Sequence, residues 1–243
     1  MQSQAITRAD AVIASIRADI LNGRLAPGSK LAFAELGALY GVSTGVLREV
    51  LSRLTEQGLA TSRPQLGYRV MTLSVDELHH LTEARVAIET QVLRQSIQTG
   101  DLEWEAQVVS AHHRLSQLPN ILHSEELSPE WLEAHRRFHA VLLEGCPNPR
   151  LRDLATHLRD LNEVYHCWSV RESATLSERD AEHRHLAEAA VSRDVKGATQ
   201  TLKEHIEKTT ELLIHSRRMQ MEMETSAAQQ HSPIGAGSPL STH

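Results

Sequence analysis

The chain has 243 residues, with 25 Lys and Arg against 31 Asp and Glu, 15 His and only 2 Cys. Two cysteines cannot frame a disulfide scaffold, and a hydrophobic fraction of 40% excludes the disordered and collagen-like classes. No apolar run approaches the ~20 residues of a membrane span, and the first residues lack the apolar core of a secretion signal. We therefore expect a cytoplasmic protein that makes no contact with a membrane.

Charge and histidine are divided unevenly along the chain. Residues 1–73 hold eight Lys and Arg and five Asp and Glu, whereas the rest of the chain is acidic and holds every histidine. This contrast predicts two domains with different partners, over 1–73 and 74–218. Residues 219–243 are rich in Gln, Ser, Gly and Pro, and we expect them to form a disordered tail.

The basic N-terminal segment predicts three helices followed by a hairpin. Apolar residues recur with a helical period, glycines end the helices, and Ser43 has the position of an N-cap. The predicted elements are helices over Thr7–Leu21, Phe33–Tyr40 and Thr44–Gln57 and strands over Leu59–Ser62 and Tyr68–Thr72. This order is typical of a winged helix-turn-helix, a DNA-binding fold.

The third helix is the predicted recognition helix. Such a helix enters the major groove by its N-terminus, where small residues let the backbone approach the DNA. Basic side chains on this helix and on the hairpin would contact phosphates or bases; the alternative is that each is solvated or pairs with Glu49 or Glu56. The candidate DNA-binding residues are Arg24, Ser43, Thr44, Gly45, Arg48, Arg53, Arg63, Gly67 and Arg69.

From Ser74 onward every predicted element is a helix. Ser74 and Glu77 have capping-box spacing, and Ser128 with Pro129 has the pattern of an N-cap followed by the first helical residue. The predicted helices run from Ser74 to about Ser96, Leu102 to Leu118, Ser128 to Glu144, Pro149 to Trp168, Glu178 to Ser192 and Val195 to Arg218. Six amphipathic helices with short connections predict a helical bundle, so the fold class is mainly α.

Histidines of this bundle form a candidate metal site. His135 and His139 are four residues apart on one helix, so both side chains project from the same face and could chelate a divalent ion. His183 and His205 lie beside apolar stripes on two later helices. The histidine doublets at 79–80 and 112–113 are assigned to the surface.

The N-terminal domain resembles the GntR family of bacterial transcription regulators. The stretches that carry the resemblance are Gly23-Arg-Leu-x-Pro-Gly-Ser-x-Leu31, Leu36-x-x-x-Tyr-Gly-Val-Ser43, Leu47-Arg-Glu-Val-Leu-x-x-Leu54, Glu56-x-Gly-Leu59 and Gly67-Tyr-x-Val70. Thr44 stands where the family often has Arg, so the operator sequence cannot be transferred from relatives.

Residues 75–215 resemble the FCD effector domain of the fatty-acid-degradation-regulator branch of this family, an antiparallel bundle of six or seven helices. The matching stretches are Glu83-Ala-Arg85-x-x-x-Glu89, His135-Arg-Arg-Phe-His139-x-x-Leu142, Glu182-His183-x-x-Leu186 and His205-Ile206. The resemblance implies a divalent metal, zinc or nickel, on His135, His139, His183 and His205. His135 stands where relatives usually have Asp. Four neutral imidazoles would leave the ion more charge with which to hold an anion, or would bind it more weakly.

Similarity to the carbon-starvation-induced regulators of this branch implies a five-carbon dicarboxylate, such as glutarate or 2-hydroxyglutarate, as the effector. It is carried by residues 81–89, 111–113 and 135–146. Arg85 is the first candidate for binding the carboxylate, and the alternative is an ion pair with Glu89. Further candidate effector-binding residues are Asn162, Tyr165 and His166.

We therefore expect a homodimeric repressor of a small-carboxylate catabolic operon. Two winged heads would bind an inverted-repeat operator in double-stranded DNA and leave it when the dicarboxylate binds the bundle. The alternative is a metal-responsive regulator in which the ion itself is the signal. An enzyme is disfavoured, because the histidine cluster holds no obvious general base and a DNA-binding head has no use in one.

Overall fold

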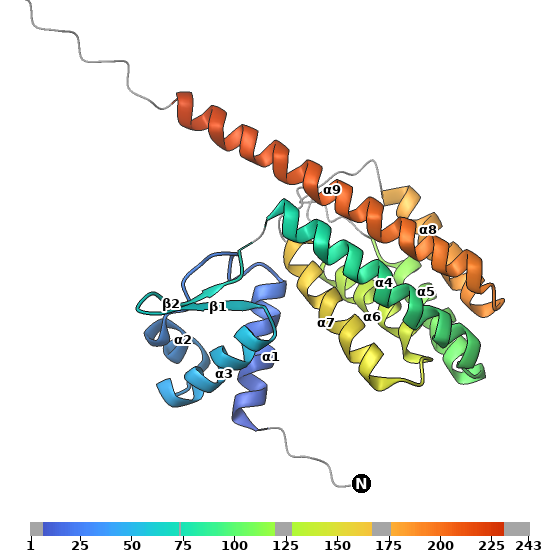
Figure 1. The fold of residues 1–243 in the computed structure, drawn as a ribbon, viewed down its shortest axis with the longest axis horizontal. Helices are drawn as coiled ribbons and strands as arrows, with labels where there is room; N and C mark the ends of the chain where they lie inside the picture. Colours follow the sequence, from blue (N-terminus) through green and yellow to red (C-terminus); the bar gives the residue numbers. More distant parts are fainter. Residues whose placement is uncertain (1–6, 73, 120–127, 167–175, 231–243) are drawn as a thin grey trace, which may run out of the picture.

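The computed structural model describes residues 7–72, 74–119, 128–166 and 176–230. In these ranges a head of three helices and a two-stranded sheet precedes a bundle of six helices, which confirms the predicted mainly α class (Figure 1). The elements are α1 Arg8–Leu21, α2 Phe33–Tyr40, α3 Thr44–Glu56, β1 Ala60–Arg63, β2 Gly67–Val70, α4 Val75–Thr99, α5 Leu102–Gln117, α6 Pro129–Glu144, α7 Pro149–His166, α8 Leu176–Val191 and α9 Val195–Gln230. None of the described helices has the length and apolar character that crossing a membrane would require.

The head is held together by the apolar faces of α1 and α3. Thr7 and Asp10 form a capping box that starts α1, and Ser43 caps α3 by accepting a hydrogen bond from the backbone of Val46. Ile16 and Ile20 of α1 and Leu47 and Leu51 of α3 are among the fully buried side chains of its core. This packing fixes α3, the predicted recognition helix, on the outside of the head.

The two strands form the predicted wing. β1 pairs antiparallel with β2, with Ala60 opposite Val70 and Arg63 opposite Gly67. The segment before α2 lies along β2, since the amide of Leu31 donates to the carbonyl of Tyr68 at 2.9 Å. Gly67 has a positive φ of 77°, which L side chains rarely adopt, so a glycine suits the tip of this hairpin.

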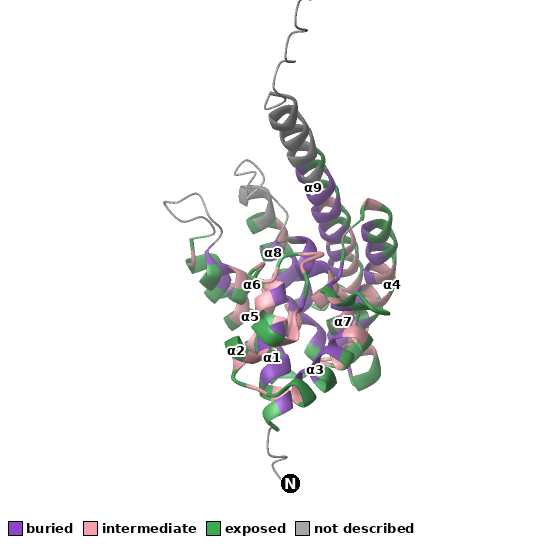
Figure 2. Cartoon of the chain, turned by 90° about the vertical axis from the view of Figure 1, so that its left-hand side faces the viewer, coloured by how far each residue is buried: buried purple, intermediate pink, exposed green. Residues whose placement is uncertain are grey.

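The bundle is built around α4, which packs against α9, α7 and α6, while α5 packs against α6 and α8. Buried residues lie on the faces that the helices turn toward one another (Figure 2). The core includes Phe138 and Leu142 of α6, Leu186 of α8 and Leu202 and Ile206 of α9, each exposed by no more than 2%. This packing brings distant parts of α6, α8 and α9 close together.

Head and bundle share one apolar core at their junction. The buried cluster of the head continues into Leu81 of α4, Val164 and Tyr165 of α7 and Ile214 of α9. Arg17 of α1 forms an ion pair with Asp160 of α7, so a polar contact accompanies the apolar one. The head therefore packs against the bundle through both apolar and polar contacts.

Most predicted elements match the structure within one to three residues, and the end of the last helix is the main exception. We expected it to end near Arg218, with a disordered tail from 219, but α9 continues to Gln230. The added residues are mostly Met, Glu, Gln and Ala, which are good helix formers, so propensity outweighs the absence of a regular apolar stripe. Residues 231–243 lie outside the described part of the chain.

Candidate metal centre and DNA-binding surface

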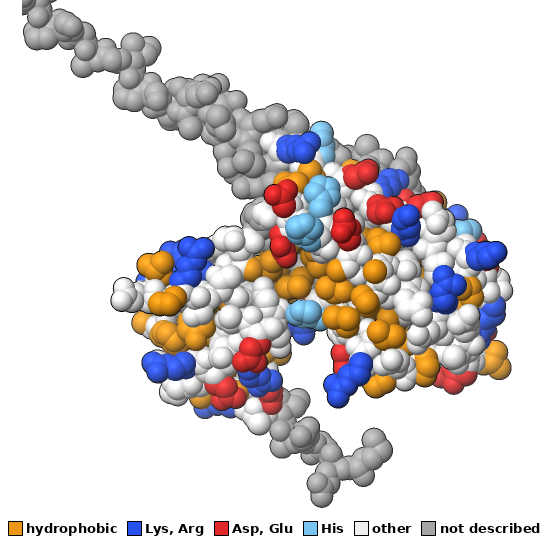
Figure 3. Space-filling view, in the orientation of Figure 1, with side chains coloured by type: hydrophobic (Ala, Val, Ile, Leu, Met, Phe, Trp, Pro, Cys, Tyr) orange, Lys and Arg blue, Asp and Glu red, His pale blue; other side chains and the backbone are white. Residues whose placement is uncertain are grey.

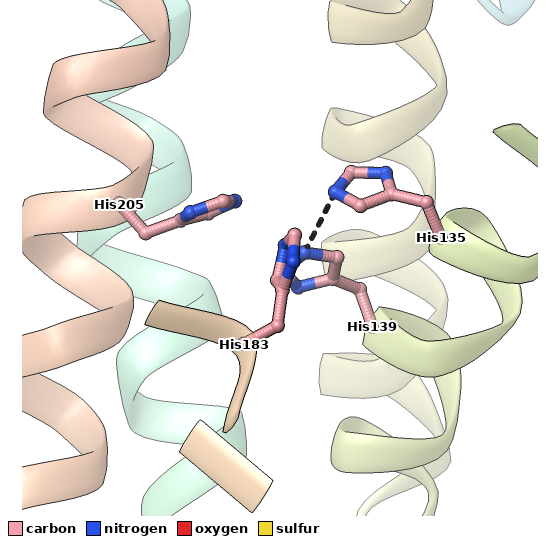
Figure 4. Close-up of side chains that lie close together, drawn as sticks. All are labelled: His135, His139, His183 and His205. Atoms are coloured by element: carbon pink, nitrogen blue, oxygen red, sulfur yellow. Dashed lines mark hydrogen bonds between the residues drawn. The ribbon is translucent and has the colours of Figure 1, made fainter. Parts of the chain in front are cut away.

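Four histidines converge inside the bundle. His135 and His139 come from α6, His183 from α8 and His205 from α9, and their rings point toward one another (Figure 4). One nitrogen of each lies within 4.8 Å of one nitrogen of every other. His139, His183 and His205 are buried, and Nε2 of His139 lies 3.1 Å from Nε2 of His135. The structure thus gathers the four predicted ligands around one point.

The protonation of His139 suits metal coordination. Burial holds the pKa of His139 well below its ordinary value, and nearby His135 and Arg159 lower it further. A neutral imidazole offers a lone pair, whereas an imidazolium does not. Imidazoles from three helices, each with a nitrogen turned to the same point, are the donor set that a zinc-type or nickel-type ion accepts, so these side chains fit one divalent ion.

His205 is oriented by a carboxylate outside the cluster. Its Nδ1 lies 2.8 Å from Oε2 of Glu182 on α8, and the ammonium of Lys208 donates to the other carboxylate oxygen at 3.1 Å. The hydrogen bond from His205 is the main cause of the lowered pKa of Glu182. Because an ionised carboxylate only accepts, Nδ1 carries the proton and Nε2 remains a potential ligand.

Two arginines and a glutamate lie beside the histidines. Nε of Arg85 donates to Oε1 of Glu89 at 2.6 Å, the ion pair that the sequence left as an alternative for Arg85. Glu89 is fully buried, and a guanidinium nitrogen of Arg159 on α7 lies 3.7 Å from its Oε2. Burial lowers the pKa of Arg159, whereas the negative charge of Glu89 raises it. The guanidinium stays charged in either case, because arginine is always protonated in proteins. Glu89 therefore holds two cations, one tightly and one more loosely.

These groups border a small cavity of about 20 Å³. It is lined by Arg85, His135, His139, Arg159, Asn162, Glu163, His205, Ile206 and Thr209. Such a volume holds about one water molecule. Oδ1 of Asn162 is buried and has no hydrogen-bond partner among the described residues. The cavity thus combines metal-binding, cationic and hydrogen-bonding groups, but it is closed to a larger molecule in this conformation.

The predicted effector-binding residues do not all meet at this cavity. Arg85 and Asn162 line it, whereas Tyr165 is buried in the junction between head and bundle. The side chain of His166 lies outside the described part of the structure. Arg159 lines the cavity but was not among the predicted residues. Arg159 could have been predicted from the sequence, because it lies three residues before Asn162 and therefore on the same face of α7.

The predicted DNA-binding residues lie on one helix end and on the wing. Ser43, Thr44 and Gly45 are exposed at the N-terminus of α3, and Arg48 is exposed one turn later. Arg63 and Gly67 are exposed where the wing turns. This arrangement leaves the N-terminal backbone of α3 and the wing tip open to solvent.

Three of the other predicted arginines are held by groups of the head itself. Arg53 pairs with Asp10 at 2.8 Å, in addition to a 4.0 Å approach to Glu49. Arg24 pairs with Asp19 at 3.0 Å but keeps a side chain that is 74% exposed. Arg69 donates to the carbonyl oxygen of Gly28 at 2.9 Å. These contacts stabilise the head, and Arg53 is the one of the three that faces two carboxylates.

Two family descriptions match the two parts of the chain. Residues 8–70 match the bacterial regulatory proteins of the gntR family, and residues 80–208 match the FCD domain. The chain belongs to the GntR family. As a GntR-family member with an FCD domain it is a DNA-binding transcriptional regulator, and its relatives carry the names of transcriptional regulators and not of enzymes.

Relatives of this GntR-family chain extend over both domains. It is 36% identical over 200 residues to the uncharacterized HTH-type transcriptional regulator BphR of Paraburkholderia xenovorans (strain LB400), covering 82% of each chain. It is 32% identical over 195 residues to the HTH-type transcriptional repressor GlaR of Escherichia coli (strain K12), covering 79% of this chain and 89% of that protein.

Solved structures share the fold of this GntR-family chain. McbR/YncC of E. coli has a TM-score of 0.74 at 18% sequence identity and covers 86% of this chain and 98% of its own. A GntR transcriptional regulator from Rhodococcus sp. RHA1 has a TM-score of 0.71 at 19% identity, with the same coverage. At these identities the likeness establishes the winged head and the helical bundle as the shared fold.

Proposed function

We propose that this regulator is a homodimeric repressor that leaves its operator when a small dicarboxylate binds the cavity beside the histidine cluster. The observation that carries the proposal is the charge of that cavity. Arg85 and Arg159 balance Glu89 and Glu163, and Arg136 approaches Glu163 within 3.9 Å from the more exposed side. The charges of Arg85 and Arg159 and of the two glutamates cancel, Arg136 adds one positive charge at the exposed side, and a divalent ion on four neutral imidazoles would add two more. A dianion is the ligand that neutralises the charge of the ion.

Each group has a distinct part in binding such an acid. A divalent ion held by the histidines would supply positive charge and a coordination position for one carboxylate. Arg85 and Arg159 would bind the other carboxylate through the forked donors that suit this group. Arg159 is the freer of the two, because it approaches Glu89 only at 3.7 Å, beyond hydrogen-bond distance. The unsatisfied oxygen of Asn162 favours an acid that also has a hydroxyl, such as 2-hydroxyglutarate.

The closed cavity explains how binding could act as a signal. A five-carbon acid does not fit a space of about 20 Å³, so the side chains or helices around it must move when it enters. A ligand shifts a conformational equilibrium only by its difference in affinity for the two states. A closed state that excludes the acid and an open state that binds it provide that difference.

The proposed contacts with DNA come from the N-terminus of α3 and from the wing. The exposed backbone at Ser43–Gly45 and the side chain of Arg48 would enter the major groove, and Arg63 with Gly67 would contact the minor groove. The other predicted contacts, Arg24, Arg53 and Arg69, would approach the phosphates from their places in the head. The relative GlaR is named a repressor, which supports the sign of the response.

A face of the bundle supports the homodimer. Hydrophobic side chains gather on the side formed by α4 and α7, next to the head (Figure 3). Leu154 of α7 is 42% exposed, and Ile88 of α4 is only half-buried. Two copies joined at this face would cover the apolar surface and present two heads, which an inverted-repeat operator requires.

The test begins with DNA. Operator duplexes would be selected from random sequences by the purified full-length chain, and binding would be followed by fluorescence anisotropy. Glutarate and 2-hydroxyglutarate would then be added with zinc present. We expect the selected site to be an inverted repeat and one of the acids to raise the Kd for the duplex about tenfold or more. If neither acid changes the Kd, the effector assignment is wrong.

A second candidate is a regulator that responds to the metal alone. The observation in its favour is the same small cavity, which has room for an ion but not for an acid. In that case zinc or nickel would change the Kd for the operator by itself, and the response would not depend on either acid. The same anisotropy titration therefore separates the two candidates.

A further inference from the structure

Helix α7 presents two different faces to two different parts of the molecule. Arg159, Asn162 and Glu163 line the cavity beside the histidines. Asp160 pairs with Arg17 of the head, and Leu161 packs against the apolar core that the head shares with the bundle. On a helix with 3.6 residues per turn, the first set and the second set lie on roughly opposite sides. The same helix thus contacts the effector cavity and the head.

The contact with the head is close but incompletely filled. Gly58, two residues after the end of α3, is so near to Leu161 that an added Cβ would lie 3.3 Å from Cδ2 of Leu161. Beside this contact a cleft of about 250 Å³ separates head and bundle. Its lining includes Arg17 and Gln57 from the head and Thr156, His157 and Asp160 from α7. Beside the shared apolar core, the Arg17–Asp160 ion pair and the close Gly58–Leu161 contact, this cleft gives the junction room to shift.

The carboxylate of Asp160 depends on its partner in the head. Burial raises the pKa of Asp160, and the charge of Arg17 is the largest opposing influence. Separating the two would leave a part-buried carboxylate without its closest cation. The ion pair therefore favours the docked position of the head over an undocked one.

We infer that α7 transmits effector binding to the head through the neighbouring residues Arg159 and Asp160. This inference rests on the proposed function, because it needs an acid that draws on Arg159. When the guanidinium of Arg159 turns from Glu89 to the acid, α7 moves with it, and Asp160 moves relative to Arg17. A rotation of about 10° displaces a group ~6 Å from the helix axis by about 1 Å, which is enough to disrupt a hydrogen-bonded ion pair.

The expected consequence is a change in the position of the head. In the docked state the ion pair and the Gly58–Leu161 contact hold α3 and the wing in the arrangement that binds the operator. In the acid-bound state the head is released from this position, and the spacing of two heads in a dimer no longer matches the two half-sites. Asp160 and Arg17 are positioning residues in this account, since neither touches the acid or the DNA.

The test compares Asp160→Asn with Glu144→Gln, a matched control that breaks the exposed Arg137–Glu144 ion pair elsewhere on the bundle. Operator binding of each full-length variant would be measured with and without 2-hydroxyglutarate in the presence of zinc. Asp160→Asn should weaken operator binding without acid about fivefold and reduce the acid response to about twofold or less. The charge-swapped variant Arg17→Glu with Asp160→Arg should restore both values toward those of the wild type.

Linkage gives a second readout that loss of folding would not produce. Because the acid binds the undocked state, Asp160→Asn should bind 2-hydroxyglutarate about fivefold more tightly than the wild type by calorimetry. Glu144→Gln should behave as the wild type in both measurements. A merely unstable variant would lose affinity for the acid and the DNA together.

The outcomes separate this inference from the proposed function. If the wild type responds to the acid and Asp160→Asn responds equally, the coupling through α7 is wrong while the effector assignment stands. If the wild type does not respond, the effector assignment fails. In that case a weaker operator affinity of Asp160→Asn, restored by the charge swap, still supports the docked head, and an unchanged affinity overturns it.

Discussion

Glu182 on α8 accepts a hydrogen bond from Nδ1 of His205 on α9 at 2.8 Å. This contact joins two helices and leaves Nε2 of the imidazole as the potential ligand atom. One ring nitrogen of His205 lies within 4.8 Å of one ring nitrogen of each of the other three histidines. A carboxylate behind a histidine is a common arrangement at metal sites, because it fixes the ring orientation and raises the basicity of the ligand. Glu182 is therefore as much a part of the candidate metal centre as the residues that would touch the ion.

Replacing this carboxylate should weaken metal binding. In Glu182→Gln the neutral amide oxygen accepts a weaker hydrogen bond from Nδ1 of His205 than the carboxylate does. We therefore expect the affinity for Zn²⁺, measured in competition with a chromophoric chelator, to fall about 10–100-fold. Glu207→Gln, which removes an exposed carboxylate near Lys203 on α9, is the matched control and should bind as the wild type does. Equal affinities of the two variants would refute the role of Glu182.

Arg159 should determine effector affinity without affecting the metal. Arg159→Lys keeps the charge that faces Glu89 but loses the fork that binds a carboxylate with two hydrogen bonds. Calorimetry should show the Kd for 2-hydroxyglutarate rising about tenfold, while Zn²⁺ affinity stays within about twofold. Arg136→Lys, at the more exposed side of Glu163, is the control. The assignment fails if Arg136→Lys loses as much affinity for the acid as Arg159→Lys.

Two glycines with positive φ allow the head–bundle contact to be isolated. Gly58 and Gly67 have φ values of 72° and 77°, but an added Cβ would meet Leu161 only at Gly58. Gly67→Ala should cost about 1–2 kcal/mol of unfolding free energy for the backbone alone. Gly58→Ala should cost about 1 kcal/mol more, because Leu161 must yield. Urea unfolding measures both, and equal losses would mean that the contact carries no energy.

The pH dependence of stability should show the capping box of α1. The hydroxyl of Thr7 and the guanidinium of Arg53 lower the pKa of Asp10 to about 2. A carboxyl whose pKa is lower in the folded state stabilises the fold above its unfolded value of about 4, and this stabilisation is lost as the pH falls toward 2. The Tm of Asp10→Asn should thus lie below that of the wild type at pH 7.

The difference in Tm should then narrow as the pH falls from about 4 to 2, since both proteins carry an uncharged side chain there. Asp76→Asn removes an exposed acid in the first turn of α4 and controls for the loss of one charge near a helix start. A difference that stays constant over this pH range would argue against the ionised carboxylate as its cause.

Local signals in the sequence were sufficient for most of the architecture. Caps such as Ser43 and Ser128, and the Gly and Pro residues between helices, define where elements begin and end, because they act within a few residues. The i,i+4 pair His135 and His139 follows from the same local geometry. That His183 and His205 join them was implied by family resemblance, since no local rule brings three helices together.

Features that depend on packing were harder to predict. Tyr165 was expected near the effector, but its helix turns it into the head–bundle core. Arg53 was predicted to contact DNA or to pair with Glu49 or Glu56, and its ion pair with Asp10, 43 residues earlier on another helix, was not foreseen. Arg159 was missed because its role comes from Glu89 on α4, and a partner on a distant helix leaves no pattern in the adjacent sequence. Long-range contacts of this kind require the tertiary structure.

The central claim is that a metal on the four histidines anchors a carboxylate effector that releases DNA. It is tested most directly by titrating the protein–operator complex with 2-hydroxyglutarate before and after chelation, for the wild type, His139→Ala and the exposed control His113→Ala. We expect release from the zinc-loaded wild type and from His113→Ala, and no release after chelation or from His139→Ala. Release that survives both chelation and His139→Ala would contradict this claim.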